Sequence, residues 1–300
     1  MSEFYNASTI AAKLNLKSPW LLLDYAEKND DTHFTGFKNF TVNEKFFTGH
    51  FPSHPIVPGV LQVETVRQLA LLFAPGDATQ WHIRKISKVK FRRQVLPGDR
   101  MRVEAEVISS TADELQIKAS CITASGACSD VQLTLGAATY EPAHLNAIPA
   151  VNGEYERNAD IFMDTDKVMS LMPHRYPFLL IDYIAKVEDN IVTAIKNVSI
   201  NEEFFNSGFT TIPEVLLCEI GAQSSCASIL ARPENAGKLG FFMAIENAVF
   251  YRPVYPGDQM IIKADLPAAG KSKFGKGSGK IYVGDELVFE ITLMFAIVDA

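Results

Sequence analysis

The chain has 300 residues, of which 47% are apolar, so it can bury one large core or two ordinary ones, and its length favours two domains of about 150 residues. Its net charge of −7 is unevenly divided, because residues 1–150 hold 15 basic and 15 acidic residues and residues 151–300 hold 13 and 20. No run approaches the roughly 20 apolar residues that cross a bilayer, and the start lacks a basic segment followed by an apolar one, which predicts a cytoplasmic protein.

An internal repeat organises the chain. SPWLLLDYA at 18–26 recurs as YPFLLIDYI at 176–184, and VNEKFF at 42–47 recurs as INEEFF at 200–205, in both cases at an offset of 158. Likewise VKFRRQVLPGD recurs as VFYRPVYPGD. The chain is therefore expected to be a duplication.

The segment between the two units is rich in Pro, Ala, Asn and charge and has little periodicity, as linkers do. We expect a first domain over residues 1–142, a linker over 143–160 and a second domain over 161–300. Each domain should have the same layout.

In chain order, each unit begins with a short apolar strand and a turn-rich passage that leads into a helix. The first helix is predicted to start at Pro58 and Gly59 and to run through GVLQVETVRQLALLF, whose apolar residues surround most of its circumference, so it should be buried. The following segments, such as RMRVEAEVI, LQIKASCITA and VQLTLGAATY, read as half-buried antiparallel strands. This order predicts an α+β fold in which a curved sheet wraps around a helix.

A basic stripe lies in RKISKVKFRR, which holds six cations and no acidic residue: Arg84, Lys85, Lys88, Lys90, Arg92 and Arg93. Such a stripe on an acidic molecule suits an acidic partner. The alternative interpretation is a solvated strand edge that lysines protect from pairing. No nucleic-acid-binding module accompanies the stripe, so we do not expect nucleic acid as the partner.

The chain has four cysteines, and they lie in apolar or strand-like surroundings without metal-ligand spacing: Cys121, Cys128, Cys218 and Cys226. We interpret them as reduced, packed thiols. Neither a disulfide nor a metal site is predicted.

GHFPSHPIVPGVLQVE at 49–64, together with PHRYPFLLID at 173–182 and the two PGD segments, resembles the β-hydroxyacyl-acyl carrier protein dehydratases of fatty acid synthesis (FabZ/FabA-like). The resemblance covers nearly the whole chain, once per half. It implies a double hotdog fold, in which each repeat has a curved antiparallel sheet around a buried central helix. It implies no metal, flavin or nucleotide.

The resemblance also assigns roles that the residues can fill. Dehydration of a 3-hydroxyacyl thioester needs a base for the α-proton, a donor for the departing hydroxyl and positive polarity at the thioester oxygen. His50 is the expected base, Gly59 presents its N–H at a helix N-terminus, and a helix glutamate with a pKa raised by burial is the expected acid. The other residues expected to contact the substrate are Phe51, Pro58 and Gln223.

The second half departs from this pattern. When Glu219 is aligned with Glu64, Gly208 stands where His50 would be, and Glu214 stands where the first half has Gly59. Conversely, PHRYPF is intact in the second half and has become NLKSPW in the first. We therefore expect a single catalytic site, in which His50 and Gly59 face Glu219, and an inactive second site in which Glu64 faces Gly208 and Glu214.

The expected substrate is a 3-hydroxyacyl group on a phosphopantetheine arm, delivered by an acidic acyl carrier protein to the basic stripe. We expect no membrane span, and because members of the family group three dimers together, the resemblance suggests a homo-oligomer of pseudo-dimers such as a trimer. Isomerisation of the double bond is less favoured. His54 and His174 are interpreted as loop-packing residues.

Two alternatives remain open from the sequence. Hotdog proteins include acyl-thioester hydrolases that place an acidic residue on the same helix, although these do not generally carry GHFP followed by PGVL. The loss of the motif histidine from the second half would also suit a non-catalytic acyl-binding partner within a synthase complex. The first would release free thiol, and the second would bind without turnover.

Overall fold

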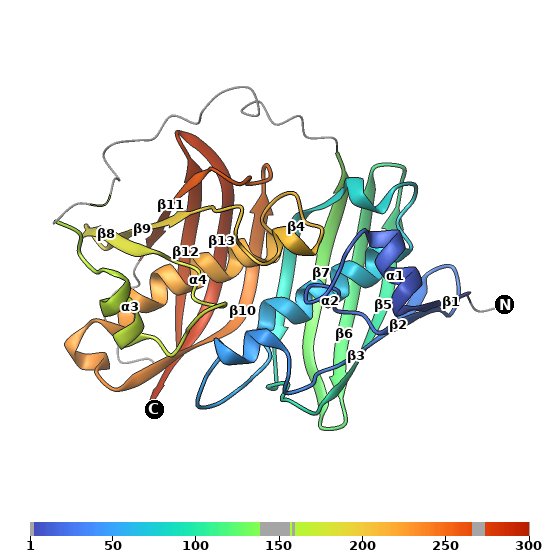
Figure 1. The fold of residues 1–300 in the computed structure, drawn as a ribbon, viewed down its shortest axis with the longest axis horizontal. Coiled ribbons are helices and arrows are strands. Elements are labelled where there is room, and N and C mark those ends of the chain that lie inside the picture. The colour runs from blue at the N-terminus through green and yellow to red at the C-terminus, as the bar shows by residue number, and fades with distance from the viewer. Residues whose placement is uncertain (1–2, 139–156, 158–159, 266–273, 300) are drawn as a thin grey trace.

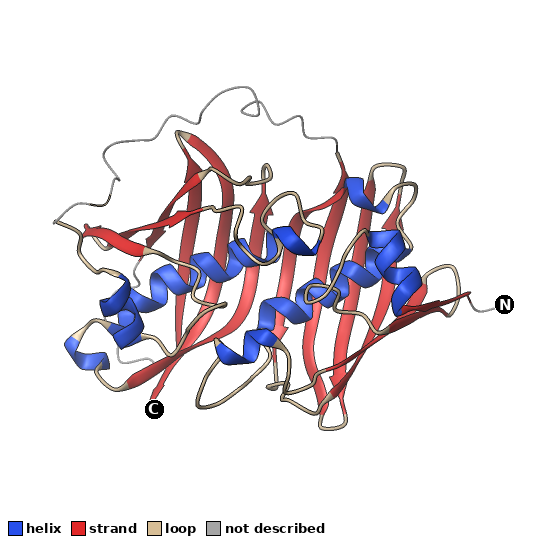
Figure 2. Ribbon diagram, viewed as in Figure 1, coloured by secondary structure: helices blue, strands red, loops and turns tan. Residues whose placement is uncertain are grey.

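The computed structural model describes residues 3–138, 157, 160–265 and 274–299. Its strands form one 13-stranded antiparallel sheet, and the helices lie on one face of that sheet (Figures 1 and 2). Most of the predicted linker lies outside the described residues. No helix in the described part of the chain is long and apolar enough to span a membrane.

Each repeat contributes a similar set of elements. The first repeat contains β1 (Glu3–Asn6), α1 (Ala7–Leu14), β2 (Tyr25–Lys28), β3 (His33–Asn39), α2 (Gly59–Leu72), β4 (Trp81–Phe91), β5 (Arg100–Ser110), β6 (Glu114–Thr123) and β7 (Gly126–Ala137). The second contains α3 (Thr165–Leu171), β8 (Tyr183–Glu188), β9 (Ile191–Asn197), α4 (Glu214–Leu230), β10 (Lys238–Phe250), β11 (Gln259–Asp265), β12 (Phe274–Val283) and β13 (Glu286–Asp299). Short 3-10 helices are η1 (Lys45–Thr48), η2 (Ala78–Gln80), η4 (Phe205–Ser207) and η5 (Pro233–Asn235).

The two half-sheets join edge to edge. The strand order is β1-β2-β3-β5-β6-β7-β4-β10-β13-β12-β11-β9-β8, so β4 and β10 stand at the junction, where Val249 pairs with Lys85 and Ala244 with Lys90. Because β4 is an interior strand, the interpretation of its lysines as protection for a sheet edge is wrong. The stripe lies instead on an exposed face in the middle of the molecule.

Each half-sheet curves around its own central helix, α2 or α4, and the two helices lie side by side (Figure 1). Every residue from Val60 to Leu72 is buried, as the apolar periphery of this segment predicts. Most buried apolar side chains of both repeats belong to one continuous cluster, and Tyr183, Ile195 and Ile261 form a small second cluster. The predicted α+β fold, in which each repeat has a curved antiparallel sheet wrapped around a buried helix, is confirmed, and the two units share a core.

The four cysteines are free, as expected; Cys121, Cys128 and Cys218 are buried, and Cys226 is partly buried. Burial raises the pKa of Cys121 to about 12, and burial together with the charge of Glu219 raises the pKa of Cys226 to about 12. Thiols with such high pKa values are poor nucleophiles at neutral pH.

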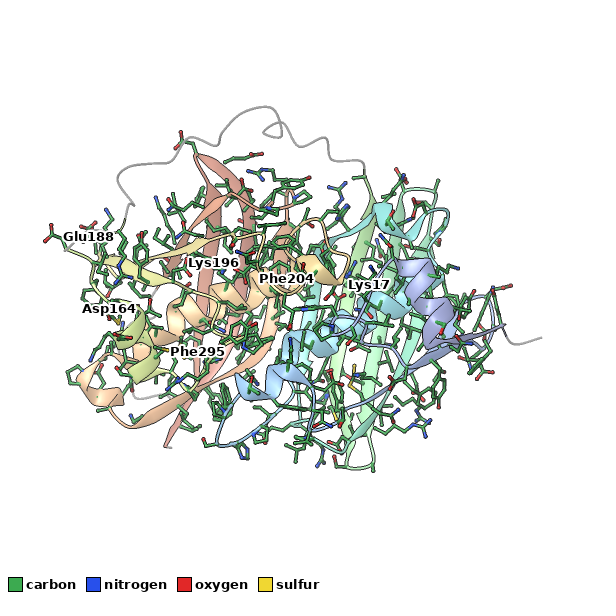
Figure 3. All side chains as sticks on the ribbon, viewed as in Figure 1. Lys17, Asp164, Glu188, Lys196, Phe204 and Phe295 are labelled. Carbon is green, nitrogen blue, oxygen red and sulfur yellow. The ribbon has the colours of Figure 1, made fainter. Side chains whose placement is uncertain are left out.

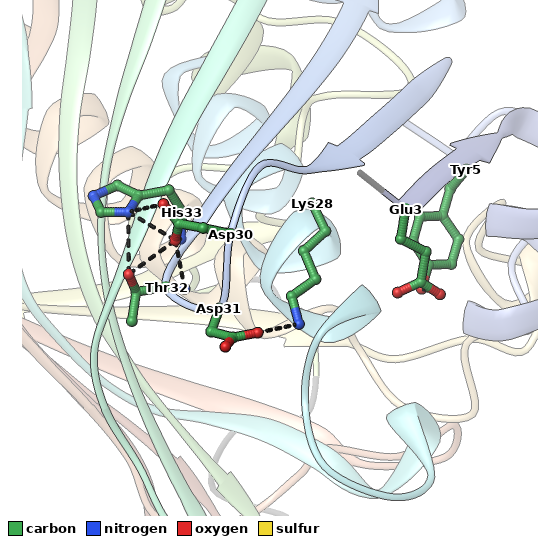
Figure 4. A network of polar contacts seen from close by, with 7 residues as sticks. All are labelled: Glu3, Tyr5, Lys28, Asp30, Asp31, Thr32 and His33. Carbon is green, nitrogen blue, oxygen red and sulfur yellow. Dashed lines mark hydrogen bonds and ion pairs between the residues drawn. The ribbon is translucent and has the colours of Figure 1, made fainter. Parts of the chain in front are cut away.

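The turn before β3 is fixed by a polar network at the outer margin of the first repeat (Figure 4). The Asp30 carboxylate accepts the backbone N–H groups of Thr32 and His33, each at 2.8 Å, and lies 3.0 Å from the His33 ring. The Thr32 N–H, and then the His33 ring, hold the pKa of Asp30 well below its usual range. An ionised Asp30 therefore closes this turn by local hydrogen bonds.

Two equivalent backbone hydrogen bonds fasten the repeats to each other. The Arg175 N–H donates to the Gly49 carbonyl at 3.0 Å, and the Lys17 N–H donates to the Ser207 carbonyl at 2.8 Å. Lys17 and Phe204, labelled in Figure 3, mark this boundary. A Cβ on Gly49 would lie 2.2 Å from the Arg175 carbonyl oxygen, so the loop that carries His50 can approach only through a glycine.

Candidate active site

A cavity of about 450 Å³ lies between the repeats. Its walls come from the loop before α2, the end of β4, the middle of α4, the start of β10 and the end of β13, where Phe295 is labelled in Figure 3. A smaller cavity of about 260 Å³ is lined by Trp20 and Phe178. At its rim Lys45 is paired with Glu203, whereas the larger cavity contains two histidines and a carboxylate and is the better candidate for chemistry.

His50 is held in one orientation by its own loop. Its backbone N–H donates to the Phe46 carbonyl at 2.8 Å, and its Nδ1 lies 2.9 Å from the Ile56 carbonyl oxygen. Because a carbonyl can only accept, Nδ1 carries the hydrogen and Nε2 keeps the lone pair. Burial lowers the pKa of His50 to about 4, against the opposing effect of the Glu219 charge. The ring is therefore neutral and available as a base.

Glu219 lies on α4 and is 5% exposed. Gln223, one turn later, donates to its Oε1 at 2.8 Å, and His174 Nε2 lies 3.5 Å from the same oxygen. Burial raises the pKa of Glu219, but the hydrogen bond and charge of His174, followed by the charge of His50, outweigh it, so the pKa lies below its ordinary value. The expectation of a raised pKa is wrong, because these neighbours stabilise the carboxylate more than burial disfavours it.

His174 is the site residue that the sequence interpretation assigned to loop packing. Its ring centroid lies 5.5 Å from that of His50 and 4.9 Å from that of Phe51. Its Nδ1 is buried and has no hydrogen-bond partner among the described residues. The signal that could have identified it is the retention of PHRYPF in the second half alone, the half that supplies Glu219.

Gly59 is the first residue of α2, as predicted, and it lines the cavity. The residue before it, Pro58, makes no side-chain cap, so the first N–H groups of the helix remain available to a ligand. A Cβ on Gly59 would lie 2.7 Å from the Phe91 ring. Glycine is thus needed for this helix to begin beside β4.

The other predicted contact residues differ in their positions. Phe51 lines the cavity and stacks on His50, with ring centroids 4.1 Å apart. Gln223 also lines it, but its Nε2 donates to the Phe178 carbonyl at 2.8 Å and its Oε1 accepts the Leu180 N–H at 2.9 Å. Pro58 is not among the lining residues. The amide of Gln223 is thus occupied in holding the FLLID segment beside Glu219.

The surroundings of Glu64, which correspond to the cavity around Glu219, are closed. The Arg67 Nε and one of its terminal nitrogens donate to the Glu64 carboxylate at 2.8 and 2.9 Å, and the guanidinium lies 5.6 Å from the centroid of the Phe209 ring. The residue that corresponds to Arg67 on α4 is Ala222, which lines the open cavity. The large side chain of Arg67 therefore fills, beside Glu64, the space that the methyl group of Ala222 leaves open beside Glu219.

Further contacts complete this closure. His82 Nδ1 lies 3.0 Å from a Glu214 oxygen, and this hydrogen bond and the Arg67 charge hold the pKa of Glu214 below its ordinary value although burial raises it. A Cβ on Gly208, where the histidine is missing, would lie 2.1 Å from the Asn15 carbonyl oxygen. The space of the inactive second site expected around Glu64 is thus filled by Arg67, His82 and the backbone of the first repeat.

The mouth of the cavity is basic. Arg92, Arg93 and Gln94 line it, and Arg92 donates to Asp130 at 2.8 Å. Lys85, Lys88 and Lys90 are exposed along β4, so the basic stripe continues to the mouth. Among the described residues no group of three or more His, Cys, Asp or Glu is arranged to hold a metal ion.

Comparisons with known proteins agree with this architecture. Residues 26–130 match the family model described as ApeI dehydratase, and residues 172–292 match that of the FabA-like domain. The 3-hydroxyacyl-[acyl-carrier-protein] dehydratase FabZ of Symbiobacterium thermophilum is 46% identical over 136 residues, which are 44% of this chain and 95% of that protein.

Two solved structures show the double fold over most of the chain. The dehydratase domain of the CurJ module of curacin polyketide synthase has a TM-score of 0.64 at 13% identity, covering 93% of this chain and 96% of that one. The acyl-CoA thioesterase II TesB2 of Mycobacterium marinum has a TM-score of 0.54 at 11% identity, covering 97% of each. Since dehydratases and thioesterases both have this fold, the fold alone does not decide between the two reactions.

The closed position yields a prediction about stability. Glu64→Gln should reduce the free energy of unfolding by about 2 to 4 kcal/mol, because it leaves the buried Arg67 without its main partner, although Glu214 still faces it. Replacing the pair together by Glu64→Leu and Arg67→Met should restore most of this loss. Denaturant titration of the wild type and the two variants measures both effects, and equal stability of the wild type and Glu64→Gln would contradict the role given to this pair.

Proposed function

Because the chain belongs to the family of 3-hydroxyacyl-[acyl-carrier-protein] dehydratases, we propose that it removes water from a 3-hydroxyacyl thioester at one site built by both repeats. Dehydration of this kind serves fatty acid or polyketide synthesis. The observation that carries the one-site proposal is the meeting of His50 and Gly59 from the first repeat with Glu219 from the second in one buried cavity.

The proposed first step is proton abstraction. His50 Nε2, which holds the lone pair, takes the proton from the carbon next to the thioester. Negative charge then develops on the thioester oxygen, and the Gly59 N–H at the N-terminus of α2 stabilises it, since both the free donor and the helix dipole favour an anion there.

In the second step the hydroxyl group leaves as water and the double bond forms. The proton for the hydroxyl comes from Glu219. An acyl chain that enters the cavity displaces water from this buried carboxylate and so raises its proton affinity, which allows Glu219 to hold a proton while the substrate is bound. Return of the proton from His50 to Glu219 completes the cycle.

Thioester hydrolysis is the second candidate function, because one observation favours it. A carboxylate that stays ionised, as the pKa of Glu219 indicates, could also activate a water molecule for attack on the thioester carbon. A single assay separates the two reactions: the dehydratase converts a 3-hydroxyacyl thioester into a 2-enoyl thioester, whereas the hydrolase releases free thiol. Thiol as the main product would overturn the proposed function, and binding without turnover would favour the non-catalytic alternative.

The partner that presents the substrate is an acyl carrier protein, as the family name states. We place its docking surface on the exposed lysines of β4, because the stripe leads to the arginines at the cavity mouth. An acidic carrier would be attracted there and its arm would reach the cavity. Assembly of the pseudo-dimers into a larger oligomer stays a prediction.

The docking surface can be tested by charge reversal. Changing Lys85, Lys88 and Lys90 to glutamate should raise KM for a carrier-bound substrate about tenfold or more and should leave kcat unchanged, because the lost attraction acts before the chemistry. The effect should shrink at high salt. A pantetheine thioester, which lacks the carrier, serves as the control, and an equal rise of KM for both substrates would contradict the docking surface.

The roles of the two repeats can be tested by three single variants. His50→Ala and Glu219→Gln should each lower kcat by about 10² or more, the usual scale for loss of a general base or acid. Glu64→Gln should keep most of the activity, because Glu64 is bonded to Arg67 away from the cavity. The His50 and Glu219 double variant should be little worse than the poorer single one, since the two act as a unit. A tolerated Glu219→Gln beside an inactive Glu64→Gln would refute the shared site.

The low pKa of His50 predicts the acid limb of the pH profile. The base must be neutral, and its pKa is lowered from 6.5 to about 4, so kcat/KM should persist as pH falls through 6.5 and be lost only as pH falls through about 4. The measurement is kcat/KM from pH 7 downwards, with circular dichroism as a check that the protein stays folded. A half-loss of kcat/KM near pH 6.5 would show that His50 is not buried as described.

A further inference from the structure

The smaller cavity, of about 260 Å³, plays no part in the reaction proposed above. None of its described lining residues belongs to a strand, and none of them also lines the larger, catalytic cavity. Its floor is formed by the first turns of the two central helices, at Leu61 on α2 and Leu216 on α4. The segments before β2 and β8, together with η1 and the loop before η4, complete its walls.

This cavity lies where the two repeats meet through equivalent residues. Five pairs of apolar lining residues stand at corresponding positions of the two repeats: Pro19 and Pro177, Trp20 and Phe178, Leu22 and Leu180, Phe46 and Phe204, and Leu61 and Leu216. The catalytic cavity, in contrast, is built from different parts of each repeat. The smaller cavity is therefore a second, separate apolar space between the repeats.

The charged groups at the rim of the smaller cavity are already paired. Lys45 forms an ion pair with Glu203 of the other repeat, and Glu202 forms one with Lys196, which is labelled in Figure 3. The other polar lining residues are uncharged: Ser199, Asn201 and Tyr176. A charged ligand would have to break one of these ion pairs or lose water without gaining an opposite charge, so the cavity favours an uncharged ligand.

The size and the lining of the cavity select the class of this ligand. An apolar cavity of about 150 Å³ holds one benzene ring, so about 260 Å³ has room for two fused rings. Aromatic side chains, which pack well against other aromatic rings, line the cavity from both repeats: Trp20, Phe46, Tyr176, Phe178 and Phe204. We propose that the smaller cavity binds an uncharged bicyclic aromatic molecule and that its occupancy changes the rate at the catalytic site.

The link between the two cavities runs through Phe46 and Phe178, which line the smaller one. The Phe46 carbonyl accepts the His50 N–H at 2.8 Å. The Phe178 carbonyl accepts Gln223 Nε2 at 2.8 Å, and the same nitrogen donates to Glu219 at 2.8 Å. The centroid of the Phe178 ring also lies 5.5 Å from that of the His50 ring. A molecule packed against Phe46 and Phe178 therefore acts on the orientation of both proposed catalytic groups.

The direction of the effect follows from the conformation that the molecule binds. A ligand favours the conformation for which it has the higher affinity. The described conformation contains the open cavity, and in it Phe46 holds His50 while Phe178 holds Gln223. Occupancy should therefore favour the catalytic arrangement and raise kcat. The binding itself is independent of the proposed function, whereas the effect on kcat rests on it.

The experiment uses the unmodified chain and two probes. One is 2-naphthol, which is uncharged at neutral pH, and the other is 2-naphthoate, which has the same two rings and a negative charge. Titration calorimetry should show one molecule of 2-naphthol bound per chain, and 2-naphthoate should bind about tenfold more weakly or worse. With a 3-hydroxyacyl pantetheine thioester as substrate, saturating 2-naphthol should raise kcat about twofold or more and leave KM within about twofold.

A pair of variants locates the binding site. Leu216→Phe should weaken the binding of 2-naphthol about tenfold or more, because the larger side chain occupies part of the cavity. The matched control is Leu217→Phe, the same change at the next residue of α4, which is also buried but does not line the cavity. Circular dichroism checks that both variants fold. An equal loss of binding in the two variants would overturn the assignment of the site.

The wild-type measurements decide the proposal even if a variant does not fold. No saturable binding of 2-naphthol, or equally tight binding of 2-naphthoate, would overturn the site. A higher KM with an unchanged kcat would also overturn it, because the molecule would then occupy the catalytic cavity. An unchanged or lower kcat with 2-naphthol bound would overturn the coupling. Absence of enoyl product in every assay would instead overturn the proposed function, and the calorimetry would still test the binding.

Discussion

The hydrogen bond from the Arg175 N–H to the Gly49 carbonyl joins the neighbour of His174 to the neighbour of His50. It is 3.0 Å long and crosses the boundary between the repeats. Through it His50 of the first repeat is held close to His174, which faces Glu219 in the second repeat. The proposed catalytic pair of His50 and Glu219, drawn from two units, needs such a fixed contact, because an error of about 1 Å in the relative position of catalytic groups can cost a factor of about 10² in rate.

The duplication shows how one helix position can acquire two uses. Glu64 and Glu219 are buried and receive the same hydrogen bond from a glutamine one turn later. They differ in the third partner, which is Arg67 in one case and His174 in the other. Arginine keeps its proton and fixes the Glu64 carboxylate as half of an ion pair, whereas the imidazole of His174 can share a proton with Glu219.

Periodicity and repeated motifs were enough to predict the two curved half-sheets and the start of α2, whereas the meeting of His50 with Glu219 was predicted from the resemblance to the dehydratase family. The pKa of Glu219 could not be predicted, because it depends on charges that only the folded chain brings together. The role of Arg67 had a signal, since VETVRQ aligned with CEIGAQ sets arginine against alanine on a buried helix face. The ion pair of Arg67 with Glu64 explains why the surroundings of Glu64 are closed. The presence of Gly208 in place of a histidine did not by itself reveal this closure.

The shared core and the β4–β10 junction also bear on how the chain folds during synthesis. Residues 3–138 are made first, and until β10 exists β4 is an uncovered edge strand beside a helix with one bare apolar flank. Such an edge invites pairing with another chain. Joining both repeats in one polypeptide keeps the correct partner at high local concentration as soon as it is synthesised. The second repeat, which has Gly208 at the position of His50, is thus also the cover of the β4 edge of the first repeat.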